Sequence, residues 1–210
     1  MTISDNGENQ VLDEIFNSGG GTFPAADPYI SLHTANPGET GANEVAGGSY
    51  ARQQVAFGAA ASGTLSNSAE IVFSGMPAGD VVAWGVWDAV SAGNCFWTGW
   101  FSTITGLLIH HTETADDNLY SPDHSFANDD RIVLEQYAGL AIPGGLTAGT
   151  IYFITGAPGT DDFTVSTTMD GGAIDITSDG QAIFYEVVVT TLGAGNQFRI
   201  AAGDLDIFLD

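Results

Sequence analysis

The stretch Val82-Ala83-Trp84-Gly85-Val86-Trp87 places three large apolar residues, Val82, Trp84 and Val86, two positions apart. A period of two puts such residues on one face of a β-strand. The same spacing recurs along the chain between clusters of Gly, Pro, Asn and Ser that are typical of turns. It recurs at Ile30 and Leu32, Val55 and Phe57, Ile71 and Phe73, and Leu205, Ile207 and Leu209. Because no amphipathic helix lies between these strand segments, the pattern predicts an all-β fold, mainly antiparallel and sandwich-like or jelly-roll-like.

One short helix is predicted near the start of the chain. Asp5 and Glu8 form an N-terminal box, and Asn17-Ser18-Gly19-Gly20-Gly21 ends the segment. Between them an apolar face repeats at helical spacing, made of Val11, Leu12, Ile15 and Phe16. Since a helix of about three turns is marginal alone, we expect it to dock on the β domain.

The middle of the chain differs from its two ends. Polar residues 112–130 precede three further strand patterns, at residues 131–135, 150–154 and 163–166. We therefore interpret residues 107–185 as an inserted small β module. Residues 1–106 and 186–210 then form one discontinuous β domain, which the chain re-enters at Val187-Val188-Val189.

The charge balance excludes several classes of protein. The chain has 26 Asp and Glu, three arginines and no lysine, for a formal net charge of -23. Three scattered arginines cannot form the basic patch that binds nucleic acid or an anionic membrane, and lysine-dependent chemistry is impossible. The N-terminus lacks the features of a signal peptide, and no apolar run approaches the roughly 20 residues of a membrane helix. The dispersed acids favour a role in solubility over a dedicated basic partner.

Metal-ligand residue types gather in one place, around His110 and His111. Glu113, Asp116 and Asp117 follow directly. In a strand His110 and His111 face opposite sides, so we expect surface residues and no metal site. Calcium at Asp116-Asp117 or Asp129-Asp130 is the weaker hypothesis, because hard cations favour carboxylates but the spacing is not that of an EF-hand.

Catalytic patterns are also weak, and we expect no enzyme and no cofactor. The serines lack a nucleophile elbow, and His33 and His124 have no triad context. Acid pairs are uninformative among 26 carboxylates. Cys95, the single cysteine, is expected to be a small buried apolar residue.

The tryptophans and arginines give two further expectations. In strands, Trp84 and Trp87 face opposite sides, as do Trp97 and Trp100, so each pair should split between core and exterior. An exposed tryptophan would suit a subunit interface or a glycan, and we favour the interface. Arg52 and Arg199 are each expected to pair with carboxylates, inside the first domain or at that interface.

A set of spaced motifs resembles the small proteins of tailed bacteriophages commonly labelled phage tail fibre protein. The motifs are Ser4-Asp5, Glu8-Asn9, Leu12-Asp13, Ile30 to Pro37, Gly38-Glu39-Thr40-Gly41, Glu44-Val45, Gly48 to Gln53, Gly85-Val86-Trp87-Asp88-Ala89, Gly93 and Ala202 to Asp206. The resemblance covers residues 1–105 and 186–210, in the family's order. That family has no long insertion at residues 106–185, which supports the inserted module.

The insertion resembles a small all-β module of phage tail and other virion surface proteins. The matching segments are His124 to Val133, Gly145 to Ile154 and Asp162 to Thr167. The match departs at Asp130, after Asn128-Asp129, where the module usually has glycine and aspartate. Neither resemblance carries catalytic residues.

Together these resemblances imply a non-enzymatic structural protein of a tailed phage particle, made in the host cytoplasm and exposed on the virion. We expect a homotrimer that associates through β-sheet interfaces. The absence of coiled-coil heptads and of short fibre repeats argues against a fibre shaft and favours a compact subunit. A capsid decoration protein bound to the major capsid protein is the first interpretation, with the insertion projecting outward. A tail fibre or appendage protein contacting tail proteins, and able to bind a host receptor or surface glycan, is the alternative. In either case the acids should avoid the attachment face.

Overall fold

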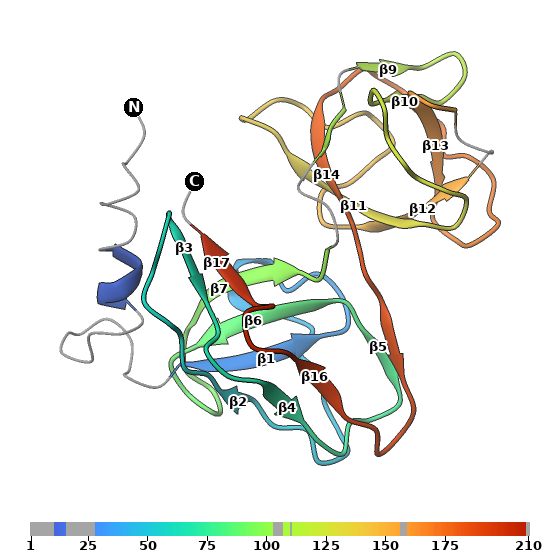
Figure 1. The fold of residues 1–210 in the computed structure, drawn as a ribbon. Helices are drawn as coiled ribbons and strands as arrows, with labels where there is room; N and C mark the ends of the chain where they lie inside the picture. The colour runs from blue at the N-terminus through green and yellow to red at the C-terminus, as the bar shows by residue number, and fades with distance from the viewer. Residues whose placement is uncertain (1–10, 16–27, 103–106, 110, 156–158, 209–210) are drawn as a thin grey trace. The chain divides into compact units, whose positions relative to one another are not determined.

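The computed structural model describes residues 11–15, 28–102, 107–109, 111–155 and 159–208 (Figure 1). The described residues form antiparallel β-structure with one short α-helix, at residues 11–15, and a 3₁₀ helix at Gly38–Thr40, which confirms the all-β class. The chain divides into two compact units. Unit 1 comprises Met1–Gly99 and Thr190–Asp210, and unit 2 comprises Trp100–Val189. Residues 100–106 and 186–189 thus group with unit 2.

The centre of unit 1 is a four-stranded sheet in the order β2-β1-β6-β7. The strands are β1 (Tyr29–His33), β2 (Gln53–Gln54), β6 (Ala83–Trp87) and β7 (Cys95–Trp100). Every residue of β6 is buried, as are the last four of β1. Both faces of these two strands are therefore covered, which explains why β6 is apolar or glycine throughout.

The C-terminal segment of unit 1 lies along residues 64–81 (Figure 1). It supplies β15 (Thr190–Leu192), β16 (Phe198–Ile200) and β17 (Asp206–Phe208), which pair in reverse order with β5 (Gly79–Val81), β4 (Ile71–Phe73) and β3 (Thr64–Ser66). In this segment Leu205 and Ile207 are buried while Asp206 and Phe208 are exposed, which confirms the half-buried strand. Leu209 lies outside the described residues. Pairing across more than a hundred residues joins the two sequence segments of unit 1 into one body.

The strand predicted at Val55 and Phe57 was wrong. Val55 is buried but follows β2, and Phe57 forms only an isolated bridge with Asn67. Residues 187–189 form no strand, because the amides of Val187 and Val188 donate to the carbonyls of Arg131 and Phe101 outside any ladder. Apolar alternation indicates burial, but a strand also needs a partner backbone, which the pattern does not reveal.

The helix at residues 11–15 docks on unit 1 through Leu12, which is fully buried. Asp13 Oδ1 accepts a hydrogen bond of 2.9 Å from the Ala60 amide. Val11 is 38% exposed, so its assignment to the apolar face was wrong. So short a helix buries one side only, and Val11 and Leu12 are about 100° apart around its axis. Asp5, Glu8 and Phe16 lie outside the described residues.

Unit 2 contains a seven-stranded antiparallel sheet in the order β8-β14-β11-β12-β13-β10-β9. The strands are β8 (Leu107–Leu108), β9 (His111–Glu113), β10 (Asn118–Tyr120), β11 (Arg131–Gln136), β12 (Ile151–Thr155), β13 (Asp162–Ser166) and β14 (Ala182–Glu186). Strands β8 and β9 occupy the two edges yet are separated by only residues 109 and 110. The sheet must therefore curl into a barrel, visible as a ring of strands in Figure 1. Closure leaves the sheet without a long free edge.

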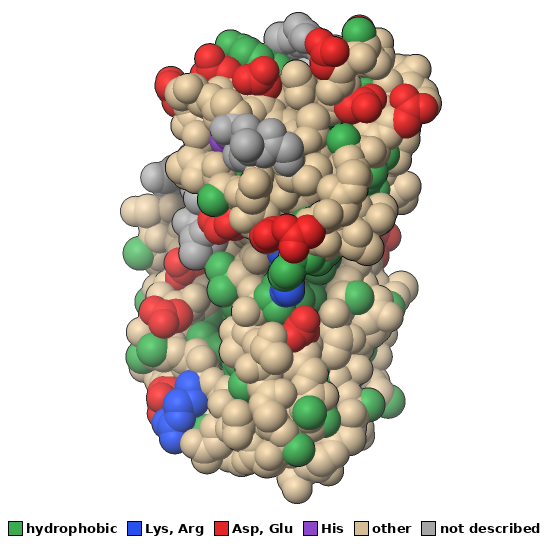
Figure 2. Space-filling view, turned by 90° about the vertical axis from the view of Figure 1, so that its right-hand side faces the viewer, with side chains coloured by type: hydrophobic (Ala, Val, Ile, Leu, Met, Phe, Trp, Pro, Cys, Tyr) green, Lys and Arg blue, Asp and Glu red, His purple; other side chains and the backbone are tan. Residues whose placement is uncertain are grey.

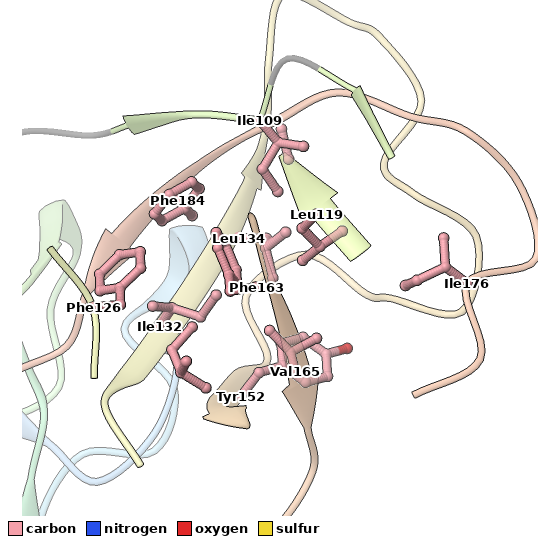
Figure 3. Packing of buried hydrophobic residues seen from close by; sticks show 12 residues of the cluster. Ile109, Leu119, Phe126, Ile132, Leu134, Tyr152, Phe163, Val165, Ile176 and Phe184 are labelled. Carbon is pink, nitrogen blue, oxygen red and sulfur yellow. The ribbon is translucent and has the colours of Figure 1, made fainter. Parts of the chain in front are cut away.

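The barrel is filled by a core of apolar side chains centred on β11 (Figure 3). Phe126, Phe163 and Phe184 pack ring against ring, with centroids 5.2–5.5 Å apart. Ile132, Leu134 and the other members are buried to 9% exposure or less. The ends of the unit meet, because the Val188 amide donates to the Phe101 carbonyl at 2.7 Å. A module with adjacent ends and its own core can be accommodated in a loop of another domain.

Candidate functional site

Arg52 of unit 1 is 8% exposed and makes several hydrogen bonds through its side chain. Its Nε and Nη2 donate to the two carboxylate oxygens of Glu44, at 2.9 and 2.7 Å. Its Nη1 donates to the carbonyls of Ala89 and Ala92, at 3.0 and 2.7 Å. The guanidinium carbon lies 3.4 Å from the centre of the Trp87 ring. The planar fork of arginine satisfies all of these contacts at once, which lysine could not do.

Tyr50 extends this group toward β1. Its hydroxyl donates to Glu44 Oε1 at 3.0 Å and accepts from the Leu32 amide at 2.9 Å. Burial raises the pKa of Tyr50 well above its ordinary range, so the hydroxyl keeps its proton. We call Glu44, Tyr50, Arg52 and Trp87 the arginine cluster. The predicted pairing of Arg52 with a carboxylate inside the first domain is confirmed.

Trp87 connects the arginine cluster to a buried polar chain on β1. Its Nε1 donates to Ser31 Oγ at 2.7 Å, and Ser31 Oγ lies 2.6 Å from Nε2 of His33. His33 Nδ1 lies 2.7 Å from the Ala42 carbonyl, which can only accept, so Nδ1 carries the proton and Nε2 accepts from Ser31. A Cβ on Gly85 would lie 2.8 Å from Ser31 Oγ, so the chain requires glycine there.

Ser31 and His33 resemble a catalytic serine and histidine pair, but a substrate cannot reach them. Both residues are fully buried, and the Ser31 hydroxyl is already engaged by Trp87. Burial lowers the pKa of His33, which keeps the imidazole neutral. The pair therefore acts as an internal hydrogen-bond chain that positions Trp87.

The loop from Asp88 to Asn94, between β6 and β7, is held from beneath by Arg52. Asp88 accepts from the backbone amide and the side-chain amide of Asn94, each at 2.8 Å, and these bonds lower the pKa of its carboxyl. Ala92 and Gly93 both have positive φ, and a Cβ on Gly93 would collide with the Asp88 carboxylate. The motif residues Glu44, Arg52, Trp87 and Asp88 thus fix one surface loop.

The expected division of the tryptophan pairs between core and exterior was wrong. Trp84 and Trp87 are both buried, at 8% and 7% exposure, while Trp97 and Trp100 are both partly buried. The two sides of β6 are covered differently: Gly99 leaves room for the Trp84 ring, and Arg52 covers Trp87. Trp100 Nε1 donates to Glu135 Oε1 at 3.3 Å in unit 2. The two buried tryptophans are thus both in β6, and those of β7 are both partly exposed.

Cys95 is partly buried and its Sγ donates to the Trp97 carbonyl at 3.5 Å. Burial raises the pKa of the thiol, which disfavours the thiolate. The sequence expectation of a packing residue agrees with these surroundings, although the side chain is less buried than expected.

Asn67 is a central residue that the sequence analysis missed. It is 2% exposed, and its side chain donates to the Ala69 and Ala201 carbonyls, both at 2.8 Å. Its Oδ1 accepts from the amides of Gly203 and Leu205, at 3.1 and 2.9 Å. Through these hydrogen bonds Asn67 holds residues 201–205 against the turn that follows β3. One polar residue in a Ser- and Asn-containing turn gave no sequence signal for this role.

In unit 2 the acidic pairs serve as acceptors for loop amides. Asp117 accepts from Ile176, Asp129 from Asp170, Asp130 from Ala127 and Asp161 from Asp123, at 2.7–3.1 Å. Asp117 and Asp129 also adopt positive φ. Within the described part of the chain, no three His, Cys, Asp or Glu side chains gather in a way that could hold a metal ion.

The histidine-rich stretch gives little further detail. His110 lies outside the described residues, His111 and Glu113 lie in β9, and Asp116 is exposed in the following turn. His124 is 7% exposed and packs against Phe126 and Phe163. Its Nδ1 accepts from the Phe126 amide at 3.3 Å, a structural role in the barrel.

The acidic residues are dispersed in space as well as in sequence. Half of the 26 carboxylates fall in each unit. Figure 2 shows the carboxylates scattered over the visible face, separated by neutral groups. Arg199 pairs with Glu70 at 2.8 Å, as expected, but both side chains are about half exposed.

Comparison with known proteins identifies the family. The model of a family described as Podophage GP4 fiber I protein gp80 matches residues 2–112. The chain belongs to this family. The match includes the whole arginine cluster and the Asp88–Asn94 loop, and it confirms the resemblance to phage tail fibre proteins. A search of curated proteins found no match.

Membership of the gp80 fibre family makes the chain a phage structural protein and a component of the virion. The description of the family names a fibre, so it favours the tail fibre interpretation over capsid decoration. No helix among the described residues is long and apolar enough to cross a membrane.

Proposed function

We propose that the chain is a non-enzymatic component of the tail fibre apparatus of a tailed phage, attached to the particle by unit 1. The family match carries this proposal, because it covers nearly all of the N-terminal part of unit 1 and ends at residue 112. What the family shares should therefore lie in unit 1. Unit 2, most of which lies outside the match, is the outward-facing module in this proposal.

The composition supports an exposed position in the particle. A formal charge of -23 keeps neighbouring particles apart, while attachment must use apolar and backbone contacts or a basic patch on the partner. We keep the expectations of a homotrimer and of an attachment face poor in unpaired acids as parts of the proposal.

Cryo-electron microscopy of intact particles tests the placement. We expect density for both units on the tail fibres or their attachment points, at a small copy number per particle. Density distributed over the capsid shell would overturn the tail proposal in favour of the decoration interpretation. Mass spectrometry of purified capsids and tails, separated before digestion, gives an independent measure of the same placement.

A receptor-binding role is the second candidate, and an exposed turn of unit 2 favours it. Ala138 and Gly139 both have positive φ, and the Leu140 amide donates to the Tyr137 carbonyl at 2.8 Å, which is the geometry of a tight type I′ turn. Tyr137 and Leu140 are 37% and 44% exposed. A rigid turn that presents a tyrosine suits recognition, because little side-chain entropy is lost on binding.

Binding to host cells tests this second role. We expect the labelled full-length chain to bind host cells, and Tyr137→Ala to bind at least several-fold less. Met169→Ala, which truncates another exposed side chain of unit 2, is the control. Equal binding by Tyr137→Ala and by the unaltered chain would exclude the turn as the receptor contact.

A further inference from the structure

We propose that the Asp88–Asn94 loop is the surface through which unit 1 contacts a neighbouring virion protein that is not a second copy of this chain. The inference rests on the proposed function and names the attachment surface within it. The partner presents an apolar contact area to the loop, with neutral or basic groups around that area.

The loop is organised in advance by buried groups. Arg52 donates to two of its carbonyls, those of Ala89 and Ala92, and is itself held by Glu44 and Trp87. Asp88 joins the two ends of the loop through its bonds to Asn94. Burial of an arginine costs free energy unless its charge is paired and its N–H groups are hydrogen-bonded. Here Glu44 pairs with the charge, and the two loop carbonyls accept from Nη1, so the buried arginine holds the loop in one conformation. Loops fixed by a rigid scaffold are where binding residues concentrate.

The surface that the loop presents is unusual for so acidic a protein. Residues 89–94 carry no charged side chain, and the Asp88 carboxylate is occupied by Asn94. Residues 90–94 are all exposed, and Val90 at the tip is 52% exposed. A neutral, ordered surface with an apolar tip desolvates at low cost, as the centre of an interface requires.

The charge of the chain decides the kind of partner. Each copy carries a formal charge of -23, so a contact between two copies through this loop would bring like charges together, and the expected homotrimer would use another surface of the chain. Gly41 lies against Trp87 and Cys95, the residues that flank the loop, and exposed Glu39 lies two positions before it. A partner with neutral or basic groups facing the rim avoids this repulsion.

The test uses particles that lack this chain, mixed with the purified full-length protein. The chain retained after sedimentation is measured by quantitative mass spectrometry. Val90→Asp places a charge on the exposed tip, and Met169→Asp is the matched control, because Met169 is 53% exposed in unit 2. Equal melting temperatures of the two variants establish that both fold.

We expect Val90→Asp to reduce retention about tenfold or more and Met169→Asp to leave it unchanged. Retention of Val90→Asp at the unaltered level would overturn the inference while leaving the proposed function intact. Failure of the unaltered chain to bind, together with its absence from complete particles, would instead contradict the proposed function. The oligomeric mass of each variant in solution is measured in parallel. If Val90→Asp dissociates an oligomer of the free chain, the contact is between copies and the assignment of the partner is wrong.

Discussion

Arg52 lies with its guanidinium carbon 3.4 Å from the centre of the Trp87 ring, although 35 positions separate the two residues. Each completes the other's surroundings: the ring covers one face of the cation, and the cation seals the ring from solvent. Glu44 neutralises the charge, and the Ala89 and Ala92 carbonyls accept hydrogen bonds from Nη1. The pair therefore couples the segment before β2 to the loop after β6.

Replacing Arg52 should destabilise unit 1 severely. Arg52→Ala leaves Glu44 without its partner and two carbonyls without their donor, so we expect the free energy of unfolding to fall by about 3–5 kcal/mol. Arg52→Lys keeps the charge but loses the fork geometry, and should recover only part of the loss. Urea unfolding followed by tryptophan fluorescence measures both.

Arg199→Ala is the matched control, because the Arg199 and Glu70 side chains are 51% and 47% exposed. An exposed ion pair contributes little, so we expect a change of at most about 1 kcal/mol. Comparable losses for Arg199→Ala and Arg52→Ala would contradict the structural role of the arginine cluster.

Asn67→Asp should loosen the C-terminal segment. The change replaces the donor to the Ala69 and Ala201 carbonyls with an oxygen, so acceptors face each other in a buried site. We expect a loss of about 2–3 kcal/mol and faster amide exchange at residues 201–205. Ser68→Ala, at the exposed neighbouring position, should leave exchange unchanged. Unaltered exchange in Asn67→Asp would show that the strand pairing alone holds this segment.

Mild acid should weaken unit 1 through His33. Burial lowers the pKa of this imidazole below its ordinary 6.5, so between those two pKa values the unfolded chain binds more protons than the folded chain. The free energy of unfolding therefore declines as the pH falls below about 6.5, by at most about 1.4 kcal/mol per pH unit, and levels off below the folded pKa.

His33→Gln separates this effect from that of the other ionisable groups of the chain. We expect the unaltered chain to lose stability between about pH 7.5 and 5.5 relative to the variant, measured by urea unfolding at each pH. Parallel curves for the two proteins would exclude His33 as the origin of the dependence.

Trypsin-type proteases should cut the folded chain slowly. Without lysine, the susceptible bonds are those after the three arginines. Arg52 is buried, Arg131 begins β11 between β12 and β14, and Arg199 lies in β16 beside two buried residues. Cleavage requires local unfolding of these strands, so we expect the intact chain to persist while the urea-unfolded chain is digested.

Leu140→Arg provides the positive control, because it places an exposed arginine at the turn of unit 2, outside the strands. We expect one rapid cut after residue 140, detected by mass spectrometry. Rapid cutting of the unaltered folded chain after Arg52 or Arg131 would show that these strands open easily.

The local sequence patterns predicted the positions of strands better than they predicted which strands pair. The period of two at Ile30 and Leu32 and at Ile71 and Phe73 correctly located strands, because alternation reports burial of one face. It failed at Val55, which is buried although it follows the end of β2. Strands β3, β5 and β15 are short and weakly apolar, and they exist because residues from the far end of the chain pair with them.

The candidate site shows the same division. The sequence predicted that Arg52 pairs with a carboxylate, since a lone cation among 26 acids must find one. It did not predict that the carboxylate is Glu44, or that Trp87 covers the guanidinium. Nor did it reveal the four side-chain hydrogen bonds of Asn67. One is made to the nearby Ala69 carbonyl, and three are made to backbone groups of residues 201–205, far away in the sequence.

By itself, the sequence determined the all-β class, the strong negative charge, the exclusion of lysine chemistry and the resemblance to phage fibre proteins. These follow from composition, from local periodicity and from motifs, which need no knowledge of distant contacts. Only the tertiary structure decided that the motif residues converge beneath one neutral loop, and that unit 2 closes into a barrel. Both depend on backbone and side-chain groups far apart in the chain, whose pairing is set by the free energy of the whole fold and not by any local stretch.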